Sequence, residues 1–151
     1  MGSQLAKAIA AGGFEVGDHT RGHCDCRTLS KNGLRIEIGN GTDHYRALTG
    51  APTVPFFRPP TGTHDRKTLE VAAEKGFKYV VLWDVDTKDW QGKSADVIRS
   101  TVLSQAKSGS IVLMHVGAPH TADALPGIIE GLRNSGYELV ALTTLLGVGS
   151  D

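Results

Sequence analysis

Two histidines lie four residues apart in a polar segment, His19 and His23. At this spacing both imidazoles can direct a ring nitrogen at one first-row divalent ion, at Zn–N distances of about 2.0–2.1 Å. Two solvated loop histidines are the alternative interpretation of the pair. A third protein ligand would have to be an aspartate, a glutamate or a cysteine such as Cys24.

Arg58 is followed directly by two prolines, Pro59 and Pro60. The two proline rings restrict the backbone after the arginine, so its guanidinium has a stiff mount. Such a mount suits an arginine that must orient a carboxylate through two parallel hydrogen bonds. A surface arginine before a turn is the alternative.

Three carboxylates and an indole follow within seven residues: Asp84, Asp86, Asp89 and Trp90. Close carboxylates raise one another's pKa unless cations or hydrogen bonds compensate. A solvated acidic loop is the alternative, although an exposed indole is costly there. His115 ends a separate apolar run, where it is either a satisfied core histidine or a general acid.

The elements that must position these residues alternate along the chain. Gly and Ser bound several helical patterns and apolar runs, as expected at helix ends and turns. The predicted helices are 4–11, a rough pattern over 28–48, 65–75, 94–106 and 121–134. The predicted strands are 14–17, 54–57, 77–85, 110–116 and 137–142. This alternation indicates an α/β fold with a mainly parallel sheet of about five strands.

The candidate residues each come just after a predicted strand. The carboxyl ends of parallel strands converge on one face of an α/β fold, where sites are built. We therefore expect one common pocket for the segments that carry the candidate histidines, arginine and aspartates.

Composition narrows the classes of function. The 151 residues include 16 basic and 16 acidic side chains. This balance gives no basic surplus for nucleic acid and no polybasic signal for anionic membranes. No apolar run approaches the ~18 residues of a membrane span, and the start has no signal-peptide pattern. Cys24 and Cys26 are too close together to join distant segments, and free thiols are expected.

Four motifs, taken in order, resemble the polysaccharide deacetylase family (carbohydrate esterase family 4, the NodB-homology domain). They are Gly17–His23, Arg58–Gly62, Asp86–Trp90 and Ile111–His115. The resemblance implies a distorted (β/α) barrel. It also implies metal-dependent hydrolysis of N-acetyl groups from chitin, chito-oligosaccharide or peptidoglycan, with release of acetate. Family members usually act at the cell envelope or after secretion.

The resemblance also implies a role for each matching residue. His19 and His23 would be two of three protein ligands to a divalent ion, usually zinc, with cobalt or nickel as alternatives. Arg58 would orient the catalytic base. His115 would protonate the leaving amine, and Asp89 would hold and tune His115.

Two further points follow from the same resemblance. Asp86 could instead be the carboxylate that supports His115, and the sequence does not separate it from Asp89. The residues expected to contact the glycan are Trp90, Leu113, Pro59 and Pro60, with Trp90 and Leu113 walling the pocket for the acetyl methyl group.

One family motif has no counterpart in this sequence. The family opens with a strand ending in a Thr-Phe-Asp-Asp-Gly-like motif, whose aspartates serve as general base and third metal ligand. No Asp-Asp pair occurs here, although Asp18 or Asp25 could replace the missing ligand. We therefore predict a single domain over residues 1–151, truncated at its N-terminal side, with an incomplete barrel.

The missing motif leaves a second function open. A catalytically impaired relic of the deacetylase fold, binding glycan or metal, is the alternative to an enzyme. Open sheet edges template pairing with another chain, so a homo-oligomer that completes the sheet is a possible form of this relic. A domain fragment with no present activity is a third interpretation.

Overall fold

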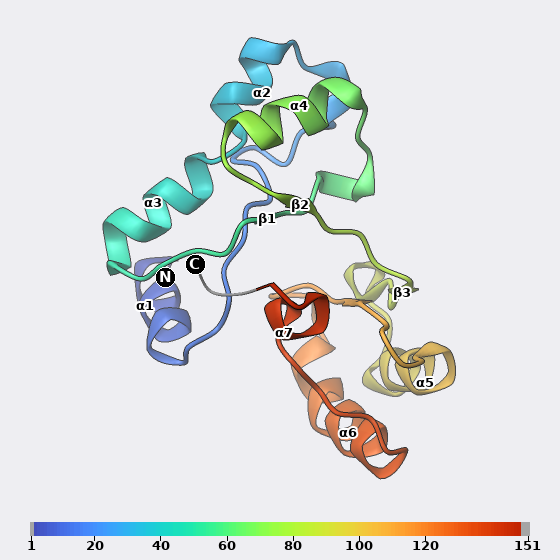
Figure 1. Cartoon of the computed structure of the whole chain (residues 1–151). Coiled ribbons are helices and arrows are strands. Elements are labelled where there is room, and N and C mark those ends of the chain that lie inside the picture. The colour runs from blue at the N-terminus through green and yellow to red at the C-terminus, as the bar shows by residue number, and fades with distance from the viewer. Residues whose placement is uncertain (1, 149–151) are drawn as a thin grey trace. The chain divides into compact units, whose positions relative to one another are not determined.

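The structure is a computed structural model that describes residues 2–148 (Figure 1). Of these, residues 2–82 form a first compact unit and residues 83–148 a second. Both units combine helices with short parallel strands, so the predicted α/β class with parallel pairing is confirmed. No helix in the described part of the chain is long and apolar enough to cross a lipid bilayer.

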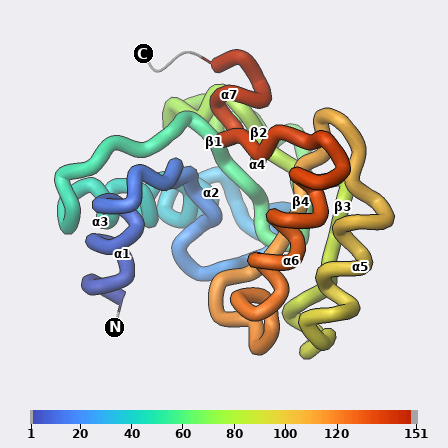
Figure 2. Tube along the Cα trace, turned by 90° about the horizontal axis from the view of Figure 1, so that it is seen from below, coloured from blue at the N-terminus to red at the C-terminus, as the bar shows by residue number. Residues whose placement is uncertain are grey.

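The first unit contains four α-helices and one pair of strands. The helices are α1 (Gly2–Ala11), α2 (Lys31–Glu37), α3 (Asn40–Thr49) and α4 (Arg66–Glu74). Short 3-10 turns lie at Cys26–Thr28 and Pro60–Gly62. β1 (Phe56–Phe57) pairs in parallel with β2 (Tyr79–Val80). Helix α2 lies beside α4, and α1 beside α3 (Figures 1 and 2).

The core of the first unit forms where α2 and α4 meet β1. Helix α4 begins at a capping box, in which the Asp65 carboxylate accepts the Thr68 N–H and the Thr68 hydroxyl oxygen accepts the Asp65 N–H. This cap fixes the start of the helix and so the direction of its buried face. The buried cluster comprises Cys26, Leu34, Ile38, Phe57, Val71, Ala72 and Phe77.

Gly17 permits the close approach that places the histidine segment next to β1. A Cβ atom at Gly17 would lie 2.6 Å from the Phe56 carbonyl oxygen, which is backbone and cannot move aside. The chain then forms an isolated parallel bridge between Asp18 and Phe57. Residues 14–17, predicted as a strand, therefore appear only as an extended lead into this bridge.

The second unit is built around two packed helices. It contains β3 (Val85–Asp86), a 3-10 turn at Asp89–Gln91, α5 (Ala95–Gln105), β4 (Val112–Leu113), α6 (Thr121–Asn134) and α7 (Leu142–Leu146). β3 and β4 pair in parallel, with Val85 opposite Val112. The buried side chains at the α5–α6 interface are Ile98, Val102, Ala124, Ile128 and Leu132.

The strands differ most from the sequence prediction. The apolar run 77–85 is not one strand, because its two ends pair in different units, as β2 and β3. The predicted strand 137–142 is wrong, since it forms no ladder among the described residues and its last residue begins α7. The predicted helix over 28–48 is two helices, because Gly39 adopts a left-handed φ of 93° between them.

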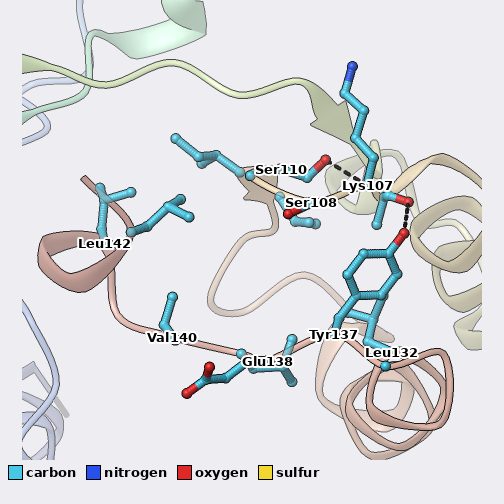
Figure 3. A pocket seen from close by; sticks show the side chains of 15 residues that line it. Lys107, Ser108, Ser110, Leu132, Tyr137, Glu138, Val140 and Leu142 are labelled. Atoms are coloured by element: carbon cyan, nitrogen blue, oxygen red, sulfur yellow. Dashed lines mark hydrogen bonds between the residues drawn. The ribbon is translucent and has the colours of Figure 1, made fainter. Parts of the chain in front are cut away.

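A hollow of about 500 Å³ in the second unit lies where the strand 137–142 was predicted (Figure 3). Its walls include residues 106–112 and residues 136–140. The Tyr137 hydroxyl closes one side by donating to the Ala106 carbonyl oxygen at 3.2 Å. None of the candidate catalytic or metal-binding residues lines this hollow.

Candidate active site

His19 is held with one ring nitrogen available for a ligand. Its Nδ1 lies 2.5 Å from the carbonyl oxygen of Arg58. A carbonyl oxygen only accepts hydrogen bonds, so Nδ1 carries the hydrogen and Nε2 keeps the lone pair. The His23 ring stands edge-on to it, with centroids 5.0 Å apart. The two imidazoles are thus in edge-on contact, and one of them is fixed by a backbone contact.

The surroundings of His19 favour its neutral form. Burial lowers the pKa of His19 below its usual value, and the charge of Arg58 lowers it further. The hydrogen bond to the Arg58 carbonyl and the charge of Asp18 act in the opposite direction but do not outweigh these effects. A neutral imidazole is the form that binds a metal ion.

The loop between the two histidines is held in an unusual backbone conformation. Thr20 and His23 have φ values of 64° and 54°, in the left-handed region that costs energy for residues other than glycine. Two local bonds hold it: the Thr20 N–H donates to Asp18 Oδ1 at 2.9 Å, and the His23 N–H to Thr20 Oγ1 at 3.1 Å. Among the described residues, two other non-glycine residues have a positive φ, Thr61 and Lys88. They lie in the motifs Arg58–Gly62 and Asp86–Trp90.

The described residues do not complete a metal site. Among residues 2–148, no group of three or more His, Cys, Asp or Glu side chains is placed to hold an ion. Neither Asp18 nor Asp25 therefore joins the two histidines in such a group. The carboxylate of Asp25 is paired with Arg27 at 2.8 Å, whereas Asp18 Oδ2 is buried without a hydrogen-bond partner. Two imidazole donors are present, and a complete three-ligand set is not.

The cysteines beside this loop are free thiols, as predicted. Cys26 is fully buried, and burial raises the pKa of its thiol to about 11. It is therefore protonated near neutral pH and is a core residue rather than a metal ligand.

Arg58 follows β1 and is tied to the histidine segment. Its N–H donates to the Asp18 carbonyl oxygen at 2.9 Å, while its own carbonyl accepts from His19. Burial lowers the pKa of the guanidinium, which nevertheless stays charged. Pro59 and Pro60 are fully buried, so they stiffen the backbone after Arg58 and offer little surface to a glycan.

His115 and Asp89 form a direct pair in the second unit. His115 Nδ1 lies 2.7 Å from Asp89 Oδ1, and the His115 N–H donates to Asp89 Oδ2 at 2.6 Å. Asp89 is fully buried, and His115 is partly exposed. Because an ionised carboxylate only accepts, Nδ1 carries a hydrogen and Nε2 is the atom free to exchange a proton.

The carboxylate of Asp89 is kept ionised by its hydrogen bonds. Burial raises its pKa, but donors from Thr121 and His115 lower it by more, and the net pKa is below the usual value. Trp90 adds a backbone N–H at 2.9 Å from Oδ1. A buried anion with this many donors can orient an imidazole and stabilise its charged form.

The neighbouring carboxylates have other partners. Asp86 Oδ1 accepts the Lys88 N–H at 3.0 Å, and Asp84 accepts from the Ser110 hydroxyl and the Ile111 N–H at 2.8 and 2.7 Å. Asp89, and not Asp86, is therefore the carboxylate that contacts His115. Of the expected glycan contacts, Trp90 is 60% exposed and Leu113 is buried.

We expect Asp89→Asn to lower the free energy of unfolding by about 3 kcal/mol, because a buried amide cannot accept from all the donors that face the carboxylate. Urea unfolding at pH 7 measures this change. Asp86→Asn is the matched control, with an expected loss below about 1 kcal/mol. An Asp89→Asn protein as stable as the parent would contradict the arrangement.

The same pair predicts how stability depends on pH. The pKa of Asp89 is lower in the folded than in the unfolded chain, so the unfolded chain binds its proton first on acidification. The stabilisation is complete above the usual aspartate pKa of 3.8 and is lost as the pH falls below it. Asp89→Asn should therefore flatten the fall in stability below the usual aspartate pKa of 3.8, as urea unfolding at a series of acidic pH values would measure.

The predicted site residues thus form two groups. His19 contacts both His23 and Arg58 in the first unit, and Asp89 contacts His115 in the second. The common pocket for both groups stays a prediction. The sequence analysis missed Thr121, whose hydroxyl donates to Asp89 Oδ2 at 2.6 Å.

Comparison with known proteins adds independent information. Residues 1–80 match the family model for polysaccharide deacetylase. The chain is 32% identical over 146 residues to a peptidoglycan-N-acetylglucosamine deacetylase of Bacillus cereus, covering 94% of this chain and 68% of that protein. Other curated relatives are longer, and the chain spans about half their length.

Solved structures agree with this match. A peptidoglycan N-acetylglucosamine deacetylase in complex with 4-naphthalen-1-yl-N-oxidanyl-benzamide superposes with a TM-score of 0.90 at 31% identity, covering 99% of this chain and 71% of that chain. A pseudoenzyme of carbohydrate esterase family 4 from Bacillus anthracis gives 0.87 at 30%, covering 97% and 51%. With the family model matching residues 1–80 of 151, the chain belongs to the polysaccharide deacetylase family.

Proposed function

We propose that this chain carries part of the active site of a metal-dependent deacetylase that removes N-acetyl groups from a chitin- or peptidoglycan-type glycan and releases acetate. The observation that carries the proposal is the buried Asp89 carboxylate bound to Nδ1 of His115. This pair leaves Nε2 positioned to exchange a proton with a substrate.

His115 would act as the general acid for amide cleavage. With Nδ1 bound to Asp89, the protonated ring presents Nε2–H, which would be donated to the amine as the carbon–nitrogen bond breaks. Leu113 and the exposed face of Trp90 would enclose the acetyl group. Arg58 would orient a carboxylate base through its stiff mount.

His19 and His23 would supply two ligands to the divalent ion, with zinc preferred over cobalt or nickel. A bound ion of this kind polarises a carbonyl and lowers the pKa of a coordinated water. The neutral form and free Nε2 of His19 suit this role. Among residues 2–148, no third His, Cys, Asp or Glu side chain completes a metal-binding group with them.

The relatives support the substrate class. They include proteins named peptidoglycan-N-acetylglucosamine deacetylase and chitooligosaccharide deacetylase. By the same likeness we propose a distorted, incomplete (β/α) barrel and action at the cell envelope or outside the cell.

A second candidate is a catalytically impaired relic that binds glycan or metal and completes its sheet by self-association. Two observations favour it: residues 2–148 lack a three-ligand metal group, and pseudoenzymes occur among the similar structures.

An acetate-release assay separates the two candidates. The deacetylase should release acetate from acetylated chito-oligosaccharides when zinc or cobalt is added, and a chelator should abolish this release. Glycan binding without acetate release under either metal would instead support the relic. A dimer by mass measurement in solution would add support to its self-association.

A further inference from the structure

Thr121 contacts the catalytic pair from a distant part of the second unit. Its hydroxyl lies 2.6 Å from Asp89 Oδ2, across 32 residues of sequence, and both residues are buried. An ionised carboxylate only accepts, so the threonine hydroxyl is the donor. A charge-assisted bond of this length is among the stronger hydrogen bonds in proteins.

The hydroxyl does not serve its own helix. Thr121 is the first residue of α6, and the N-cap position before it, where small polar side chains commonly cap backbone N–H groups, is occupied by His120. His120 makes no side-chain capping bond. The start of α6 thus leaves its own cap unfilled while Thr121 donates to Asp89.

The donors divide evenly between the two oxygens of Asp89. Oδ1 accepts from the Trp90 N–H and from His115 Nδ1, at 2.9 and 2.7 Å. Oδ2 accepts from the His115 N–H and from Thr121, each at 2.6 Å. Thr121 is the one side-chain donor to Oδ2 among the described residues, and it opposes rotation of the carboxyl group away from the imidazole.

We propose that Thr121 is a positioning residue, which locks the Asp89 carboxylate and so fixes the Nδ1–H tautomer of His115. The catalytic part of this proposal rests on the proposed deacetylase function. Without the hydroxyl, Oδ2 keeps only the His115 N–H as a donor, so the carboxyl group is held less firmly and the competing Nε2–H tautomer becomes populated. That tautomer has no Nδ1 hydrogen for Asp89, and its ring is no longer held for proton transfer.

The test compares Thr121→Val, which removes the hydroxyl and keeps the shape, with Thr121→Ser, which keeps the hydroxyl. Thr101→Val is the control, because the Thr101 hydroxyl bonds only to the Val97 carbonyl in α5, at 2.8 Å. The 15N chemical shifts of the His115 ring report its tautomer in the folded 151-residue chain. Acetate release measures kcat and KM separately, and circular dichroism checks the fold.

Thr121→Val should give mixed tautomer signals at His115 and lower kcat by about 10-fold, the effect of losing ~1.4 kcal/mol, while KM changes less than about two-fold. Thr121→Ser and Thr101→Val should keep the parent tautomer and stay within about two-fold of the parent kcat. If Thr121→Val fails to fold, Thr121→Ala takes its place with the same expectations.

A folded Thr121→Val chain with the parent's His115 signals would overturn the proposal, as would equal signal changes in Thr101→Val. The nitrogen shifts do not depend on turnover. A parent chain that releases no acetate therefore counts against the proposed function, while the tautomer comparison still decides the role of Thr121.

Discussion

Replacing His115 with alanine should lower acetate release by about 10²- to 10⁴-fold, the range in which a positioned general acid contributes. The loss should appear in kcat, because the imidazole acts on the leaving amine as the bond breaks. The reason is structural: the Nδ1 hydrogen of His115 is bonded to Asp89, which leaves Nε2 to exchange a proton with the substrate. The measurement is acetate release at saturating chito-oligosaccharide, with added zinc.

His120→Ala is the matched control for this experiment. His120 lies five residues further along the same unit, and its nearest acidic group is Asp123 at 3.9 Å. Its loss should leave kcat within about two-fold. An equal loss in both variants would show that the effect comes from the fold of the segment. Full activity in His115→Ala would remove the histidine from the mechanism.

The second large effect concerns metal affinity. Replacing His19 and His23 together with alanine should weaken zinc binding by at least about 100-fold, since losing a single outer-shell partner of a metal ligand already costs about 10–100-fold. The two rings are the imidazoles that the first unit places side by side. Isothermal titration with zinc, at neutral pH and without a chelating buffer, measures the change.

A control with His44→Ala and His64→Ala removes the same number of imidazoles. The His64 ring bonds to the Gly62 carbonyl at 3.0 Å, and neither residue belongs to a metal-binding group among residues 2–148. This variant should bind zinc as the parent does. Equal zinc affinity in the parent and the His19/His23 variant would place the metal elsewhere.

Helices could be predicted from the sequence because their signals are local. Ser94 caps α5 and Asp65 caps α4, at the positions where the sequence predicted these helices to begin. Strands depend on partners far along the chain. The run 137–142 is apolar enough for a strand, yet it finds no ladder, and Leu139 and Val140 stay exposed.

The site could be predicted in part for the same reason. The spacing of His19 and His23 and the position of His115 follow from the sequence. The sequence could not distinguish Asp89 from Asp86, because the contact with His115 depends on the turn at Asp89–Gln91. The left-handed backbone of Thr20 and His23 could not be predicted either, because neither residue is a glycine. Thr121 could not be predicted, since its bond to Asp89 joins residues 32 positions apart in the sequence, with α5 and β4 between them.

The donors around Asp89 also bear on how such a site changes over evolutionary time. Two of them are backbone amides, those of Trp90 and His115, which persist through any substitution other than proline. Mutations that remove a proposed metal ligand in the first unit would leave the hydrogen bonds between Asp89 and His115 intact. A descendant without turnover could therefore regain it through few changes, because the pair of Asp89 and His115 does not have to be rebuilt.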